Sequence, residues 1–276
     1  MSDSEYFPSG EKCHECGREI MCYNAFAPIG VRPFIAKKSC LCVEERRGKV
    51  IEKGRPIVRE HMLDASGLSA KRYRGYTFAD CITDKNNRAA VEAAQRFLEA
   101  YQDGTVSHGL LFHGPVGSGK SFPAYAIGNA IVESYPISDS LAEQYGKNSY
   151  YSTNGPTAVP VPLRIYNAVG LMDKIREGFD TLDLEKKEYF ASLVSRCQRT
   201  PLLILDDLCA EKESQWTNER FYSIFHYRWE RELPTIVTTN ATPRDLFTRL
   251  YDRTADRIKS DCKAIYVPGS SRRKTA

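Results

Sequence analysis

The sequence predicts an α/β protein with a five-stranded parallel sheet, preceded by a small cysteine-rich N-terminal module. Three observations lead to this prediction. Short apolar runs alternate with helical stretches in the second half of the chain, which is the pattern of a parallel sheet covered on both faces. One of these runs leads into a glycine-rich segment. Five of the nine cysteines lie before residue 43, which indicates metal binding rather than disulfides.

The apolar runs predict the strands of the sheet in order along the chain. The expected strands are residues 109–113, 163–166, 202–205, 235–238 and 264–267. Each of the first four is followed by a helical stretch, and apolar residues also recur at helical spacing between Asn86 and Gln102. Because such a sheet binds ligands beyond the carboxyl ends of its strands, functional residues are expected there.

Three regions of different composition predict the domain organisation. Residues 1–60 are rich in cysteine, glycine, proline and charge, which predicts a zinc-binding and partner-binding module without a large core. Residues 61–85 are interpreted as a linker and residues 86–276 as the α/β domain. The stretch 136–162, rich in serine, tyrosine and proline, is predicted to be a long loop.

The bulk properties are those of a soluble protein. The net charge of +4 permits contact with nucleic acid but does not argue for it. Basic clusters at 46–49, 71–74 and 272–274 fit either a solvated surface or phosphate contacts. No apolar run is long enough to span a membrane and the first residues do not resemble a secretory signal, so we expect a cytoplasmic protein without membrane contact.

The glycine-rich segment GPVGSGKS matches the phosphate-binding pattern G-x-x-x-x-G-K-[ST], between an expected strand and a helical stretch. The residues expected to bind nucleotide here are Gly114, Pro115, Val116, Gly117, Ser118, Gly119, Lys120 and Ser121. Backbone N–H groups and the helix N-terminus would hold the phosphates. Lys120 is expected to reach the β- and γ-phosphates and Ser121 to bind Mg²⁺. The motif therefore predicts ATP and Mg²⁺ as ligands.

Polar side chains end two other expected strands. Asp206 and Asp207 follow a buried apolar run, and Asn240 follows another. We expect Asp206 to hold Mg²⁺, and Asp207 or Glu211 to polarise the attacking water. Asn240 is expected to contact the γ-phosphate or that water. Alone, these residues would fit strand-end and turn positions equally well.

Several segments together resemble the AAA+ ATPases of the DnaC-type helicase loaders and the IstB-type transposition helpers. They are GPVGSGKS, LLILDDL, HYRWERELPTIVTTN and, upstream, LSAKRYRGYTFADC, and the resemblance covers about residues 66–273. Only 36 residues follow Asn240, too few for a lid of several helices, and this family likewise lacks that lid. Cys209 stands where the family commonly has glycine.

The resemblance also implies how the ATP sites are completed. It assigns Asn240 as a sensor of the γ-phosphate and implies self-association, with an arginine of one subunit reaching the ATP of its neighbour. Arg257 is the best match to this arginine, and Arg253 is the alternative. Arg273 or Arg272 resembles a second sensor at the nucleotide. The simpler interpretation of these arginines is surface ion pairing.

Four cysteines have the spacing of a zinc site: Cys13, Cys16, Cys40 and Cys42. Two short-spaced pairs can close a tetrahedral Zn²⁺ site, and metal binding would stabilise a module with few apolar residues. His14 and Cys22 are reserve ligands. A redox pair is disfavoured because no βαβ pattern surrounds these cysteines.

The resemblance implies an ATP-hydrolysing loader of a replicative helicase onto single-stranded DNA, with the N-terminal module gripping the helicase. The alternative is an IstB-like helper that acts on target DNA with a transposase. A small-molecule kinase is disfavoured by the paired aspartates and the Thr-Thr-Asn strand end. A fourth alternative is a non-enzymatic zinc adaptor with a vestigial nucleotide site, which measured hydrolysis would exclude. Aromatic residues between Trp216 and Trp229 fit core packing better than a base-stacking platform.

Overall fold

The computed structural model describes residues 6–25, 34–37, 40–147, 158–180, 182–211 and 214–270. The chain divides into two compact units, residues 1–58 with 137–158 and residues 59–136 with 159–276. Within the described ranges, no helix combines the length and the apolar character needed to cross a membrane.

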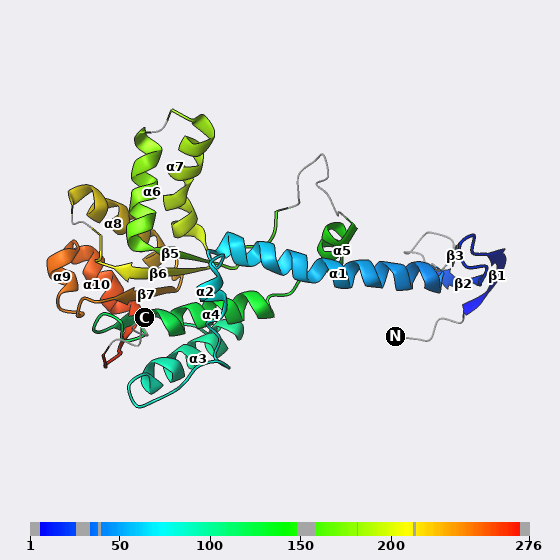
Figure 1. Ribbon diagram of the computed structural model, residues 1–276. Helices are drawn as coiled ribbons and strands as arrows, with labels where there is room; N and C mark the ends of the chain where they lie inside the picture. The colour runs from blue at the N-terminus through cyan, green and yellow to red at the C-terminus, as the bar shows by residue number, and fades with distance from the viewer. Residues whose placement is uncertain are drawn as a thin grey trace. The chain divides into compact units, whose positions relative to one another are not determined.

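The second unit is built on a parallel sheet (Figure 1). Its strands are β4 (Gly109–His113), β5 (Leu163–Asn167), β6 (Leu202–Leu208), β7 (Thr235–Thr239) and β8 (Cys262–Tyr266), in the order β5-β6-β7-β4-β8. All five predicted strands are confirmed, although the last begins two residues earlier than predicted. Strand β6 also continues past its apolar run, so that both aspartates belong to the strand.

Helices cover both faces of this sheet. One face carries α3 (Arg88–Gln102) and α4 (Ser121–Ser134), and the other carries α6 (Ala168–Asp180), α7 (Leu184–Arg199), α8 (Gln215–Trp229) and α10 (Asp252–Asp261). Successive strand residues point to opposite faces. Leu203 and Leu205 accordingly join the core beneath α6 to α10, while Ile204 lies against Gly128 of α4. Two short helices, α2 (Lys71–Arg74) and α9 (Leu246–Arg249), complete the unit.

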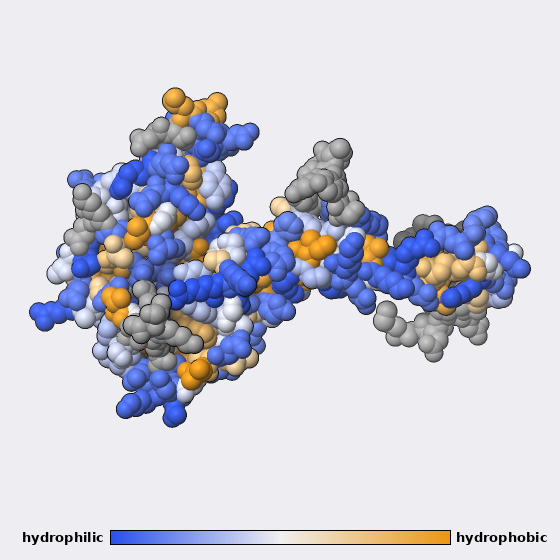
Figure 2. Space-filling model, viewed as in Figure 1, coloured by the Kyte–Doolittle hydropathy of each residue, from blue (hydrophilic) through white to orange (hydrophobic). Residues whose placement is uncertain are grey.

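Up to residue 270, where the described chain ends, no helix follows β8. On the surface, Figure 2 shows hydrophobic side chains at the tip of the α6–α7 hairpin, where Leu182 and Leu184 are 98% and 79% exposed.

The first unit contains an antiparallel sheet and two helices. Its elements are β1 (Tyr6–Lys12), β2 (Glu19–Ala25), β3 (Phe34–Lys37), α5 (Asp139–Lys147) and the part of α1 (Leu41–Ser66) up to residue 58. The sequence did not reveal α1, because charged residues interrupt its apolar spacing. A Cβ atom on Gly54 of α1 would lie 1.7 Å from the carbonyl oxygen of Ala142, so α1 and α5 cross in close backbone contact. Because α5 lies within residues 136–162, part of the predicted long loop is a helix. Residues 148–157 of that loop lie outside the described chain.

Candidate nucleotide and metal sites

The loop between β4 and α4 requires its glycines. Gly114, Gly117 and Gly119 have φ angles of 147°, 80° and 101°, values that L side chains rarely adopt. At Gly114 the space is also closed, since a Cβ atom would lie 2.3 Å from the carbonyl oxygen of Val267. The loop is therefore shaped by residues without side chains, which leaves its backbone free to approach a ligand closely.

Lys120 connects this loop to the end of β7. Its Nζ donates hydrogen bonds to the carbonyl oxygen of Pro115 at 2.7 Å and to Oδ1 of Asn240 at 2.8 Å. The side chain is buried, with 5% of its surface exposed. These contacts hold the ammonium group at the loop, beside two residues that the sequence predicted to act with it.

Asp206 lies beside the first residue of α4. Its Oδ1 accepts hydrogen bonds from Ser121 Oγ at 2.7 Å and from Thr238 Oγ1 at 2.6 Å. Burial raises the pKa of the Asp206 carboxyl, while the two hydroxyl donors oppose this rise. A carboxylate and a hydroxyl this close supply the hard oxygen ligands that Mg²⁺ prefers, so the residues fit the predicted magnesium site.

An irregularity in β6 turns Asp207 in a different direction from Asp206. The register of β6 against β7 shifts between Leu205 and Leu208, and the φ angle of Asp207 is 59°. Such bulges redirect side chains at the ends of strands. Asp207 consequently lines the nucleotide cavity and accepts a hydrogen bond of 3.4 Å from Asn240 Nδ2.

The backbone of the turn after Asp207 explains why glycine is common where this chain has Cys209. Cys209 has a φ angle of 67°, in the left-handed region that favours glycine. Its backbone N–H donates to Glu211 Oε1 at 3.2 Å. Of the two residues proposed from sequence to polarise water, Asp207 therefore faces the cavity, whereas Glu211 stabilises this turn.

A cavity of about 370 Å³ opens beside the phosphate loop. Sequence reasoning missed most of the side chains on its far wall, which come from the predicted linker and α3: Arg72, Tyr76, Asp80, Cys81, Ile82, Asn87, Ala90 and Val91. Tyr76 packs against Phe122 with ring centroids 5.0 Å apart, and Asn129 of α4 donates to the Tyr76 carbonyl at 2.9 Å. The aromatic residues of the linker were the available signal. The apolar surface of these aromatic side chains suits the base of a nucleotide whose phosphates lie in the loop.

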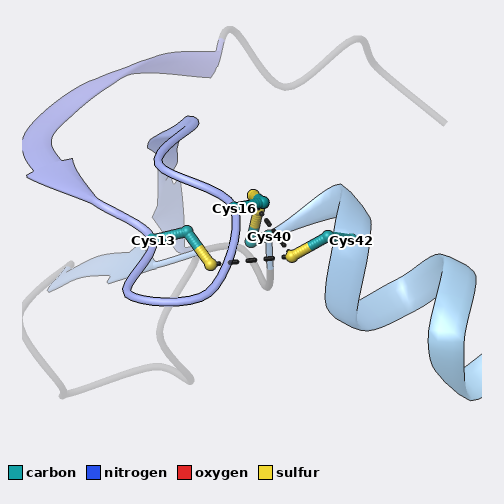
Figure 3. A group of neighbouring side chains, drawn as sticks. All are labelled: Cys13, Cys16, Cys40 and Cys42. Atoms are coloured by element: carbon teal, nitrogen blue, oxygen red, sulfur yellow. Dashed lines mark hydrogen bonds between the residues drawn. The ribbon is translucent and has the colours of Figure 1, made fainter.

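The four predicted zinc ligands converge in the first unit (Figure 3). The Sγ atoms of Cys13 and Cys42 are 3.6 Å apart, and those of Cys16 and Cys40 are 3.4 Å apart. A tetrahedral site with zinc–sulfur bonds of about 2.3 Å requires sulfur separations of about 3.8 Å, so the four thiols fit Zn²⁺. Backbone N–H groups of Cys16 and Glu15 lower the pKa of Cys13 to about 6, whereas hydrogen bonds with the Cys16 and Cys40 thiols raise the pKa of Cys42, so Cys13 ionises more readily than Cys42. The reserve ligands His14 and Cys22 are not in this cluster.

The chain as a whole is similar to known replication proteins. The replicative helicase loader DnaI of Bacillus subtilis is 23% identical over 245 residues, which cover 88% of this chain and 68% of the relative. The crystal structure of the DnaC helicase loader superposes with a TM-score of 0.54 and 22% identity, covering 72% of this chain and all of that one. The chain thus shares the fold of the solved DnaC helicase loader. No protein-family profile matches the chain.

A more distant AAA+ neighbour carries ligands. The replication initiator DnaA bound to AMPPCP and single-stranded DNA superposes with a TM-score of 0.50 and 20% identity, over 71% of this chain and 50% of that chain. The present chain therefore spans about half of that initiator structure.

The predicted arginines lie away from the cavity of their own AAA+ domain. Arg257 packs against α8, where its Nη2 lies 3.1 Å from His226 Nδ1. Arg253 is exposed. Neither belongs to the cavity wall that the described residues form. Arg272 and Arg273 lie outside the described residues.

Proposed function

We propose that this chain is an ATPase that loads a replicative helicase onto single-stranded DNA. The observation that carries the proposal is that Lys120, Asp206 and Asn240 converge on the glycine-rich loop between β4 and α4. This constellation favours binding of a magnesium-bound triphosphate. Similarity to two proteins named as helicase loaders favours a helicase as the partner.

The roles of the residues follow from the geometry. Lys120 would neutralise charge on the β- and γ-phosphates, and backbone N–H groups of residues 114–121 would hold their oxygens. Ser121 and Asp206 would hold Mg²⁺, which polarises the phosphates. Asp207 would orient the attacking water, because it faces the cavity and lies within reach of Asn240. Asn240 would then link the γ-phosphate to the end of β7.

Self-association would complete each site. Arg257, with Arg253 as the alternative, would reach the ATP of a neighbouring subunit and stabilise the transferring phosphoryl group. Arg273, or Arg272, would contact the nucleotide as a second sensor. Because Arg257 and Arg253 do not line the cavity of their own domain, a role for either requires a second subunit.

The N-terminal unit would provide the grip on the helicase. Cys13, Cys16, Cys40 and Cys42 would hold Zn²⁺, whose binding energy would fold a module that has little core of its own. The DnaA structure that contains single-stranded DNA supports DNA contact by the AAA+ domain.

Hydrolysis by mixed subunits tests the proposal. Lys120→Ala and Arg257→Ala proteins should each hydrolyse ATP far more slowly than wild type, and together they should regain activity because one supplies the intact loop and the other the intact arginine. Arg253→Ala serves as the matched comparison on the same helix. The proposal fails if Lys120→Ala still hydrolyses ATP with single-stranded DNA present. A parallel assay should detect helicase on single-stranded circles only when wild-type protein and ATP are added.

A further inference from the structure

The guanidinium group of Arg257 contacts three residues of α8. Its Nη1 donates to the carbonyl oxygen of Arg253 at 2.8 Å, as a contact within its own helix, while its Nη2 lies 3.1 Å from His226 Nδ1. The guanidinium carbon lies 5.3 Å from the ring centroid of Tyr222 and 5.1 Å from that of Trp229. These are cation–π distances, at which an aromatic face attracts a guanidinium group.

The three rings form one stack along α8, which we call the aromatic cage (Tyr222, His226 and Trp229). The centroids of Tyr222 and His226 are 5.3 Å apart with planes 15° apart, and those of His226 and Trp229 are 6.3 Å apart with planes 21° apart. Residues spaced by four and then three positions lie on the same helix face. The sequence spacing of α8 therefore builds the cage without help from another element.

The cage is separate from the hydrophobic core. Phe221, Ile224 and Phe225 of the same helix are buried against the sheet, whereas Trp229 remains 45% exposed. The core face thus does not require an aromatic stack on the adjoining face of the helix. What the stack contacts instead is the guanidinium of Arg257.

Hydrogen bonding fixes how the guanidinium is turned. A His226 Nδ1 that accepts from Arg257 must carry its proton on Nε2, which lies 3.4 Å from Glu230 Oε1. The Arg257 Nε is buried and has no hydrogen-bond partner within the described chain. The contacts of α8 therefore constrain both the plane and the direction of the arginine.

We propose that the aromatic cage positions Arg257 for the ATP of the neighbouring subunit. This inference rests on the shared-site part of the proposed function, and it assigns Tyr222, His226 and Trp229 as positioning residues. A planar guanidinium recognises phosphate oxygens best when its orientation is set in advance. Loss of the cage should leave ATP binding intact and lower the rate of hydrolysis at the neighbour.

The main test is the variant Trp229→Ala, measured as ATP hydrolysis with single-stranded DNA. We expect the turnover number to fall about tenfold or more, because a small misplacement of a catalytic group has effects of this size. Affinity for a magnesium-bound ATP analogue should stay unchanged. The matched control is Tyr227→Ala, since Tyr227 stacks on Arg231 at 3.8 Å and does not contact Arg257. That control should stay within twofold of wild type.

Two further measurements separate positioning from general damage. Trp229→Ala protomers mixed with Lys120→Ala protomers should regain activity, because the latter supply a caged Arg257 to intact loops. The double variant Trp229→Ala/Arg257→Ala should be no slower than Arg257→Ala alone, since both changes act through one group. His226→Ala provides the same comparisons if the tryptophan variant unfolds.

Three results would overturn the inference: wild-type turnover in both cage variants, failure of mixing to restore activity, or an additive loss in the double variant. These results are distinct from failure of the proposed function. If Arg257→Ala itself hydrolyses ATP at the wild-type rate, the role of Arg257 at the shared site fails whatever the cage variants do, and the shared-site proposal then depends on Arg253.

Discussion

Replacing Arg228 should destabilise the second unit more than replacing Arg231, an exposed arginine that follows α8. Arg228 is 1% exposed, and its described hydrogen bonds go to uncharged oxygens. Its Nη1 donates to the carbonyl oxygens of Cys197 at 2.9 Å and of Thr200 at 2.8 Å. The Cys197 carbonyl ends α7, where the residue four positions later is Pro201, which has no N–H to donate. Arg228 thus supplies the hydrogen bond to the Cys197 carbonyl that the backbone of Pro201 cannot donate.

The same side chain also reaches the start of β7. Its Nε donates to Thr235 Oγ1 at 2.8 Å and its Nη2 to the Pro234 carbonyl at 2.6 Å. Arg228 therefore ties together the segments that lead into β6 and β7. Asp206 lies near the carboxyl end of β6 and Asn240 directly follows β7, so this arginine supports the site from the opposite ends of the two strands.

The magnitude can be estimated for Arg228→Met. Burial lowers the pKa of Arg228 from 12.5 to about 10, which corresponds to a charge-burial cost of about 3 kcal/mol that methionine would remove. Hydrogen bonds from a charged donor contribute about 1.5 kcal/mol each, so losing the four short ones costs about 6 kcal/mol. The net loss is about 3 kcal/mol in the free energy of unfolding, or about 6–12 °C in the melting temperature.

Thermal unfolding of the full chain without nucleotide checks this estimate. The control is Arg231→Met, because Arg231 lies on the surface against Tyr227 and should contribute less than about 0.5 kcal/mol. Melting temperatures of the two variants within 2 °C of each other would refute the reasoning that the carbonyls depend on Arg228.

Three other perturbations have defined outcomes. Gly114→Ala places a Cβ atom 2.3 Å from the Val267 carbonyl oxygen, so affinity for a magnesium-bound ATP analogue should fall more than about tenfold; an affinity within twofold of wild type would contradict this. Burial and the charge of Lys120 lower the pKa of His113 below its usual 6.5. The unfolded chain therefore takes up this proton first, stability falls as pH drops below about 6.5, and melting curves of His113→Gln should show a smaller fall. Purified protein should contain stoichiometric zinc by elemental analysis and Cys16→Ser should lose it, whereas metal-free wild type would exclude the site.

The elements predicted correctly depend on local patterns. The run LLILDD predicts a buried strand that ends in carboxylates, because burial on both faces of a parallel sheet requires continuous apolar residues. The phosphate loop could also be predicted from the sequence, since its glycines stand at the positions whose backbone angles need them. Short cysteine spacings likewise located the four thiols that converge in the structure.

The sequence by itself determined the positions of the strands along the chain, the phosphate loop and the two short-spaced cysteine pairs, because each depends on residues within a few positions. Only the tertiary structure decided which acid faces the cavity, since a register shift against β7 turns Asp207 toward it. Tertiary packing also brought linker residues to the cavity wall, buried Arg228 against two chain segments and placed Arg257 on α8. These features join residues far apart along the chain, and no local periodicity records which distant groups will satisfy a buried donor or acceptor.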